Sequence, residues 1–113
     1  MQPKLLKYIL DIESVIGEIE NIDRRVEGDF TRFIDDILIQ RAAERDLEII
    51  GEAVRNIRDQ FPEINISSSS KIIGLRNLIA HAYDSVEPEM LWGIIQRDIP
   101  VLKKEIQEMK KSA

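Results

Sequence analysis

One short segment contains the residue types that could do acid–base and phosphate chemistry. It runs from Gly74 to Tyr83 and holds the only histidine of the chain, His81, with Arg76 five positions before it and Tyr83 two after it. Histidine exchanges a proton near neutral pH. The planar guanidinium of arginine binds two phosphate oxygens at once. These two groups are close to the minimum for cutting RNA without a metal, because the ribose 2′-hydroxyl supplies the nucleophile.

The same residues also have plain structural interpretations. His81 could be a helix C-terminal residue that interacts with the helix dipole, and Arg76 could be a surface ion-pair partner. Tyr83 could be an ordinary aromatic residue at the rim of the core. Asn77, directly after the arginine, could bind a phosphate or hold the histidine in one tautomer. An arginine followed five residues later by a histidine is a weak pattern, so the residues alone leave these alternatives open.

The composition predicts one small domain, residues 1–113, without a metal or cofactor. The chain has no cysteine and one histidine, which excludes disulfide scaffolds, thiol chemistry and the usual zinc ligand sets. No spaced cluster of acidic residues indicates magnesium. No uninterrupted apolar stretch indicates a signal peptide or a membrane span, so a cytoplasmic location is expected.

The charge balance limits how the chain could bind nucleic acid. The net charge is −5 and the pI is about 4.9, which disfavours non-specific binding to phosphates. An RNA substrate would therefore need a local basic cleft. The candidate walls of such a cleft are Arg41 with Arg45, Arg55 with Arg58, and Lys71 near Arg76. Acidic residues lie among them, so a solvated helix face with ion pairs is the alternative, and the acidic balance equally suits a protein partner.

Apolar residues recur at helical spacing along most of the chain. The pattern predicts a helix over 5–24, a short extra helix over 30–37 capped by Asp29, and a long helix over 43–61 ended by Pro62. The serine-rich residues 67–70 predict a loop and the start of a motif helix over 71–82. A last helix over 88–109 should kink or restart at Pro100, with Asp98 as a possible cap.

These elements predict an all-α fold, an up-down bundle of four main helices with a possible short extra helix. The apolar stripes are wide for such short helices, which predicts a homodimer. At about 100° per residue, Arg76 and Tyr83 lie nearly on one face, whereas His81 lies about 140° from Arg76. A straight helix does not bring the two together. Either the helix unwinds near Ala80 or the helices of two subunits border one cleft.

The motif segment resembles the HEPN superfamily, and within it the HepT toxins of HepT–MntA toxin–antitoxin pairs. That family has the motif R-x-x-x-x-H-x-Y, which Arg76, His81 and Tyr83 match, with Asn77 at a position that is often polar. The segments 47–53 and 91–100 are similar to the second-helix signature and the last helix of the family. One departure is visible: the family often has a tryptophan in the loop before the motif helix, where this chain has serines 67–70.

The resemblance implies a homodimeric, metal-independent ribonuclease toxin with Arg76 and His81 at a dimer cleft. It also implies a partner, an MntA-like nucleotidyltransferase antitoxin that adenylylates Tyr83. An alternative from another class is a non-catalytic helical subunit that binds a nucleotidyltransferase and its nucleotide or substrate, with Arg76 and His81 holding a nucleotide.

Overall fold

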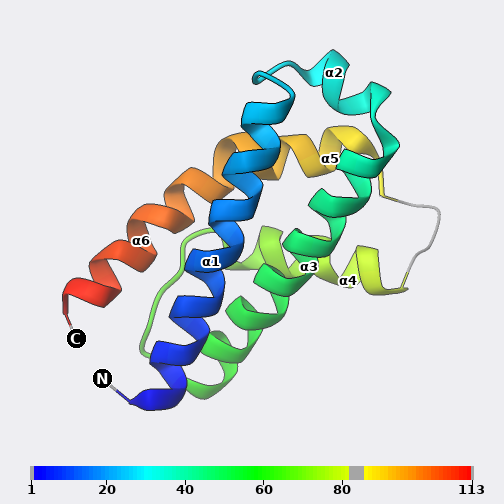
Figure 1. The fold of residues 1–113 in the computed structure, drawn as a ribbon. Coiled ribbons are helices and arrows are strands. Elements are labelled where there is room, and N and C mark those ends of the chain that lie inside the picture. The colour runs from blue at the N-terminus through cyan, green and yellow to red at the C-terminus, as the bar shows by residue number, and fades with distance from the viewer. Residues whose placement is uncertain (1, 82–85, 113) are drawn as a thin grey trace.

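The computed structural model describes residues 2–81 and 86–112, and they form helices joined by short connections (Figure 1). No strand occurs within these two ranges. The elements in chain order are α1 (Pro3–Arg25), α2 (Phe30–Asp35), α3 (Ile37–Gln60), α4 (Ser69–His81), α5 (Pro88–Gly93), the π-helical turn η1 (Ile94–Asp98) and α6 (Ile99–Lys111). The prediction of an all-α bundle with a short extra helix is confirmed.

The helix α3 is the centre of the bundle. It packs along its length against α1 on one side and α4 on another, while the run α5–η1–α6 lies across α1 and closes the bundle (Figure 1). The short helix α2 joins α1 to α3 at one end, where Phe30 and Phe33 contact Trp92 of α5 with ring centroids 5.9 and 5.0 Å away. The motif helix α4 is therefore held mainly by α3, with a smaller contact with η1.

The predicted apolar stripes form the core. On α1 and α3 the stripe residues are almost all buried, because spacings of three and four place them on one face. These are Leu5, Ile9, Ile12, Ile16 and Ile19 on α1, and Ala43, Leu47, Ile50, Val54 and Ile57 on α3, with Phe61 just after it. On α4, Ile72 and Leu75 are buried as predicted and Ile79 is half-buried.

Side-chain caps set several of the helix boundaries. Asp29 accepts a hydrogen bond from the backbone N–H of Thr31 at 2.9 Å, which confirms it as the cap of α2. Asp36 caps α3 in the same way through the N–H groups of Leu38 and Ile39, so the short helix does not run unbroken into the long one. At the other end α3 stops at Gln60, two residues before Pro62, as predicted.

The prediction for Asp98 is wrong. The side chain caps no helix and is instead buried, where it accepts a hydrogen bond from the Ser68 hydroxyl and contacts the Arg97 guanidinium, each at 3.2 Å. The chain passes Pro100 through η1, in which the N–H of Ile99 bonds the Ile94 carbonyl five residues back. A π-helical turn therefore accommodates Pro100, which has no backbone N–H to donate, and no new helix cap is needed.

The interface between α1 and α3 contains a buried acid. Asp46 is 3% exposed, and its burial, with a smaller contribution from contact with the Glu18 carboxyl, raises its pKa to about 7. Arg45 opposes this shift. Asp46 contacts Glu18 of α1 and lies about 140° around α3 from Gly51, the residue that packs against α4, so we expect it to affect the stability of the bundle rather than the motif helix.

Some apolar side chains remain exposed, notably Leu38, which is 78% exposed, with Ile34 and Ile37 beside it in sequence. Such a patch is compatible with a second copy, and the homodimer stays a prediction. None of the helices in the described ranges has both the length and the apolar character needed to span a bilayer.

Candidate active site

Arg76 lies on the side of α4 that packs against α3, and a glycine makes this packing possible. A Cβ atom placed on Gly51 of α3 would clash with the Cβ of Arg76, and it would lie 2.9 Å from the Arg76 Cγ and 3.2 Å from the Ile72 carbonyl oxygen. Only a residue without a side chain allows this approach. Gly51 therefore fixes where the base of the Arg76 side chain lies.

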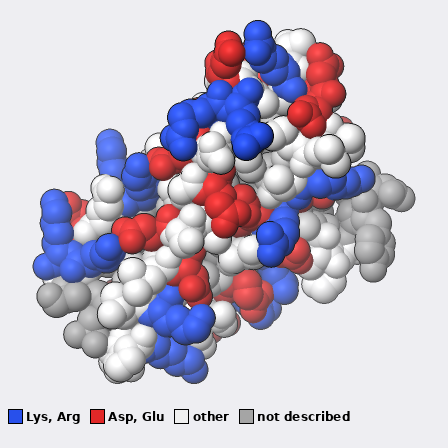
Figure 2. Space-filling model, viewed as in Figure 1, with Lys and Arg blue, Asp and Glu red and all other residues white. Residues whose placement is uncertain are grey.

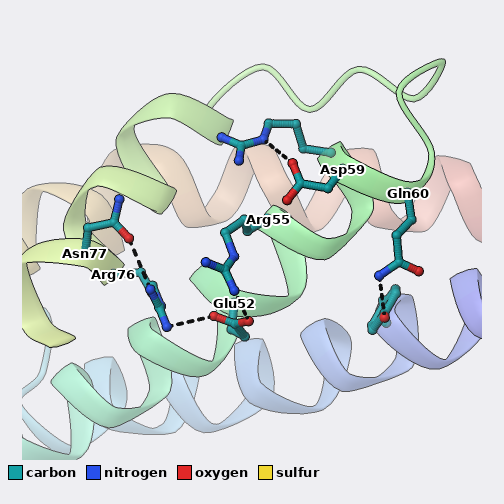
Figure 3. Close-up of polar contacts among 8 residues, drawn as sticks. Glu52, Arg55, Asp59, Gln60, Arg76 and Asn77 are labelled. Carbon is teal, nitrogen blue, oxygen red and sulfur yellow. Dashed lines mark hydrogen bonds and ion pairs between the residues drawn. The ribbon is translucent and has the colours of Figure 1, made fainter.

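The Arg76 guanidinium is held by a small polar cluster (Figure 3). Its Nη2 atom lies 3.0 Å from Oε2 of Glu52, an ion pair whose angle falls outside hydrogen-bond geometry. Its Nη1 atom donates to the Asn77 side-chain oxygen at 3.2 Å. The other Glu52 oxygen accepts from Arg55 at 2.6 Å. One carboxylate is thus shared by two guanidinium groups, which leaves this cluster with a net charge of +1.

Arg76 also lines an open groove of about 440 Å³ between α1 and α3. Lys7, Asp11 and Glu48 line the same groove, and Lys7 is paired with Asp11 at 2.9 Å. The side chain of Arg76 is 18% exposed, so part of it reaches the groove while the rest is packed. An arginine in this position has a fixed base and an accessible tip, which suits binding of an anion.

His81 is the last residue of α4 and is exposed. Helical geometry continues through Ala80 to His81, so the unwinding that could have brought it toward Arg76 does not occur. At about 100° per residue the two side chains project from different faces of the helix, and no hydrogen bond or ion pair joins Arg76 to His81 or Asn77 to His81 among the described residues. Tyr83 lies outside the described residues.

Most of the other candidate basic residues are paired with acids. Arg41 contacts Glu44 at 3.2 Å, Arg55 contacts Glu52, and Arg58 contacts Asp59 at 2.9 Å. On the face shown in Figure 2, basic and acidic side chains alternate and form no continuous basic surface. The interpretation as an ion-paired helix face therefore holds for these three arginines.

Metal-ligating side chains do not gather in the described part of the chain. Within residues 2–81 and 86–112, no group of three or more histidine, cysteine, aspartate or glutamate residues is placed to hold a metal ion.

Sequence reasoning missed the positioning roles of Gly51 and Glu52. One signal was present: a glycine in the middle of the longest helix costs about 1 kcal/mol relative to alanine, so it indicates a packing requirement. Glu52 had no such signal, because its spacing to Arg55 is that of an ordinary surface ion pair and its contact with Arg76 depends on how two helices pack.

Comparison with known proteins identifies relatives along almost the whole chain. A family model described as "Ribonuclease HepT-like" matches residues 12–109. A "putative RNase" of Caldanaerobacter subterraneus subsp. tengcongensis is 37% identical over 100 residues, 87% of this chain and 89% of that protein. A "putative RNase" of Methanocaldococcus jannaschii is 39% identical over 104 residues, 88% of this chain and 91% of that protein.

A third relative, named "Probable ribonuclease HepT", comes from Thermococcus cleftensis and is 36% identical over 108 residues, 92% of this chain and 94% of that protein. No solved structure is a significant match. The matched range includes both α3 with Gly51 and Glu52 and α4 with Arg76 and His81. The chain therefore belongs to the ribonuclease HepT-like family of the HEPN superfamily.

Proposed function

We propose that this protein is a metal-independent endoribonuclease toxin in which Arg76 and His81 act on a phosphodiester of RNA. Membership of the ribonuclease HepT-like family supports an RNA-cleaving activity. The observation on which the proposal mainly depends is Arg76, whose guanidinium is held by Glu52 and Asn77 and reaches a groove with its tip.

The proposed reaction is an intramolecular transfer at phosphorus. The ribose 2′-oxygen forms a bond to phosphorus, the bond from phosphorus to the 5′-oxygen breaks, and the products are a 2′,3′-cyclic phosphate and a 5′-hydroxyl. His81 accepts the 2′-hydroxyl proton as a general base or donates a proton to the leaving 5′-oxygen. Arg76 stabilises the negative charge that builds up on the phosphoryl oxygens. No water or metal-bound hydroxide is needed as the nucleophile.

The two residues work together across a dimer in this proposal. Within one chain they project from different faces of α4, about 140° apart on a regular helix. A symmetric dimer brings the same surface of both copies together, so Arg76 of one copy can face His81 of the other. Exposure of His81 at the end of α4 leaves it accessible for such a contact.

The direct test is cleavage of total cellular RNA by the purified protein in excess EDTA, with chemical identification of the product ends. We expect cleavage with cyclic phosphate ends, and a loss of about 10²-fold or more in His81→Ala and in Arg76→Ala. Circular dichroism should show that both variants remain folded. Equal activity of wild type and His81→Ala would contradict the catalytic assignment.

We further propose that an MntA-like nucleotidyltransferase antitoxin neutralises the enzyme by adenylylating Tyr83. Tyr83 is two residues from His81, so the added nucleotide would bring bulk and negative charge to a phosphate-binding site and repel RNA. Tyr83→Phe should remain active and escape the antitoxin. Equal neutralisation of wild type and Tyr83→Phe would refute this mechanism.

The same experiments separate this proposal from the alternative of a non-catalytic subunit that binds a nucleotidyltransferase and its nucleotide. An intrinsic ribonuclease of this type should remain active in EDTA, whereas nucleotidyl transfer by a partner should stop. Absence of cleavage by the wild type would favour the non-catalytic subunit.

A further inference from the structure

A second groove lies on the other side of the motif helix, between α4 and the run α5–η1. It has a volume of about 430 Å³, within the range of small-molecule and cofactor sites. The lining residues that matter here are Lys71, Gly74 and Leu78 on α4, and Met90, Gly93 and Arg97 on α5 and η1. The proposed reaction assigns no role to this groove.

Two glycines, Gly74 and Gly93, border free space in the groove. A Cβ atom added at Gly74 or at Gly93 would meet no atom within 4 Å, so neither glycine is required for close helix packing. Gly93 has the ordinary backbone conformation of a right-handed helix, with φ −59° and ψ −44°, so its backbone does not require glycine either. Two other lining residues, Leu78 and the 38% exposed Met90, supply an apolar surface. An apolar surface of this kind suits contact with an aromatic ring.

The charges of the groove suit a phosphate next to that ring. Lys71 and Arg97 line it against one carboxylate, Glu89, in a chain with a net charge of −5. Arg97 is 63% exposed and uses its Nη2 atom to contact Asp98, which leaves most of its donors available. Asp98 is itself anchored by the Ser68 hydroxyl. The serine-rich segment thus restrains Arg97, which lowers the entropic cost of binding an anion.

Gly74, which borders the groove, lies on the same face of α4 as the proposed catalytic histidine. Gly74 and His81 are seven residues apart, so they lie within about 20° of each other around the helix. Leu78 is one turn before His81, and Lys71 lies about 15 Å before it along the helix axis. An RNA strand whose reacting phosphate lies at His81 could therefore place a neighbouring nucleotide between Gly74 and Gly93.

We propose that this groove binds one nucleotide of the single-stranded RNA substrate next to the cleavage site, with its base between the two glycines and its phosphate on Lys71 and Arg97. The inference rests on the proposed ribonuclease function. Apolar contact with the base and cationic contact with the phosphate are the two interactions that single-stranded nucleic acid offers at every position. The apolar Leu78 and Met90 suit the base, and the cationic Lys71 and Arg97 suit the phosphate.

The test is RNA binding and cleavage by two groove variants, each with a matched control. Gly74→Leu fills the groove, and Gly17→Leu places the same side chain on α1 at another exposed helical glycine with no atom within 4 Å of an added Cβ. Arg97→Ala removes a cation paired with the next residue, and Arg58→Ala removes one with the same local pairing to Asp59. Binding is measured by fluorescence anisotropy of a labelled single-stranded RNA of mixed sequence, with His81→Ala added to prevent cleavage.

We expect Gly74→Leu to weaken RNA binding about tenfold, because the leucine side chain occupies the space proposed for the base and removes the apolar contacts of that base. Arg97→Ala should weaken binding and lower the slope of log K against log salt by about 0.7, the value for one phosphate contact on a single strand. A purely structural role would not change that slope. In the active background both variants should raise KM more than they lower kcat, and both controls should behave as wild type.

The outcomes separate this inference from the function beneath it. Wild-type cleavage that His81→Ala abolishes, together with groove variants that match their controls in binding, would overturn the groove and leave the ribonuclease intact. Altered sedimentation of Gly74→Leu with unchanged RNA binding would show a protein-binding surface and would also overturn it. Absence of both RNA binding and cleavage in the wild type would overturn both. If Gly74→Leu does not fold, the salt slope of Arg97→Ala decides.

Discussion

The two sides of α4 differ in how closely they are packed. On the side that faces α3, Gly51 lets the two helices approach so closely that an added methyl group would overlap Arg76. On the side that faces α5, Gly74 and Gly93 border open space. The first side is packed and holds a guanidinium in place with Glu52 and Asn77. The second leaves a groove bordered by Gly74, which lies on the same face of α4 as the exposed His81.

This difference suggests a division of work between the two faces of one helix. A group that stabilises charge has to be fixed before the reaction, and fixing it requires close packing and charged neighbours. A surface that receives a flexible strand has to stay open. The comparison therefore predicts that substitutions on the α3 side change catalysis and stability together, while substitutions on the α5 side change RNA binding with little cost to the fold.

The largest effect should come from Gly51→Ala. The new methyl group overlaps the Cβ of Arg76, so the helices must separate, at a cost of about 1–3 kcal/mol. A shift of Arg76 by about 1 Å should lower kcat by up to about 100-fold. Thermal unfolding and single-turnover cleavage measure the two effects. Gly17→Ala is the matched control. If Gly51→Ala keeps the wild-type kcat, close packing of α3 against α4 does not position Arg76.

Glu52→Gln should have the next largest effect. The amide keeps the size of the side chain and removes the charge shared by Arg55 and Arg76, so Arg76 is less firmly oriented. We expect cleavage to fall about tenfold, as for the loss of one charge-assisted contact. The control is Glu44→Gln on the same helix, which disrupts only the pair with Arg41. Equal rates for the two variants would show that Glu52 does not position Arg76.

Asp46 allows stability to be changed without touching either face of α4. Its pKa in the folded protein is raised to about 7 by burial, above its ordinary value of 3.8, so the folded state binds this proton more tightly than the unfolded state does. The stabilisation from this proton is complete below pH 4 and is lost as pH rises through 7. Thermal unfolding should therefore occur at lower temperature at pH 8 than at pH 5.

Asp46→Asn should remove much of this pH dependence and stabilise the protein at pH 8 by about 1 kcal/mol or more. The rate at pH 8 should be unaffected by the substitution, because Asp46 faces α1 rather than α4. A large change in rate would mean that stability alone, rather than the local packing around Arg76, controls activity. An unchanged dependence of unfolding on pH would exclude Asp46 as its source.

Gly74→Ala should have the smallest effect, and it should stabilise the protein where Gly51→Ala destabilises it. Its methyl group meets no atom, so the substitution should stabilise α4 by about 0.5–1 kcal/mol through helix propensity and leave kcat unchanged. Urea unfolding can resolve this difference. Destabilisation by Gly74→Ala would mean that both faces of α4 are packed and that the contrast with Gly51 is not real.

Features that depend on residues close together in the sequence could be predicted, whereas contacts between different helices could not. Helix spacing, the Asp29 cap and the stop at Pro62 are local, and they predicted the elements and the buried stripes of α1 and α3. The angle between Arg76 and His81 was also predictable, because both residues lie on one helix. The contact of Glu52 with Arg76, the overlap at Gly51 and the buried bond from Ser68 to Asp98 join different helices, so no spacing indicated them.

The central claim is that Arg76 of one copy works with His81 of another, and a mixing experiment tests it most directly. His81→Ala and Arg76→Ala are purified separately, mixed under conditions that exchange subunits, and assayed for RNA cleavage in EDTA. Each mixed dimer restores one intact pair and half of the dimers are mixed, so about one quarter of wild-type activity should return. Activity that stays at the level of the separate variants after verified exchange would contradict a site shared between two copies.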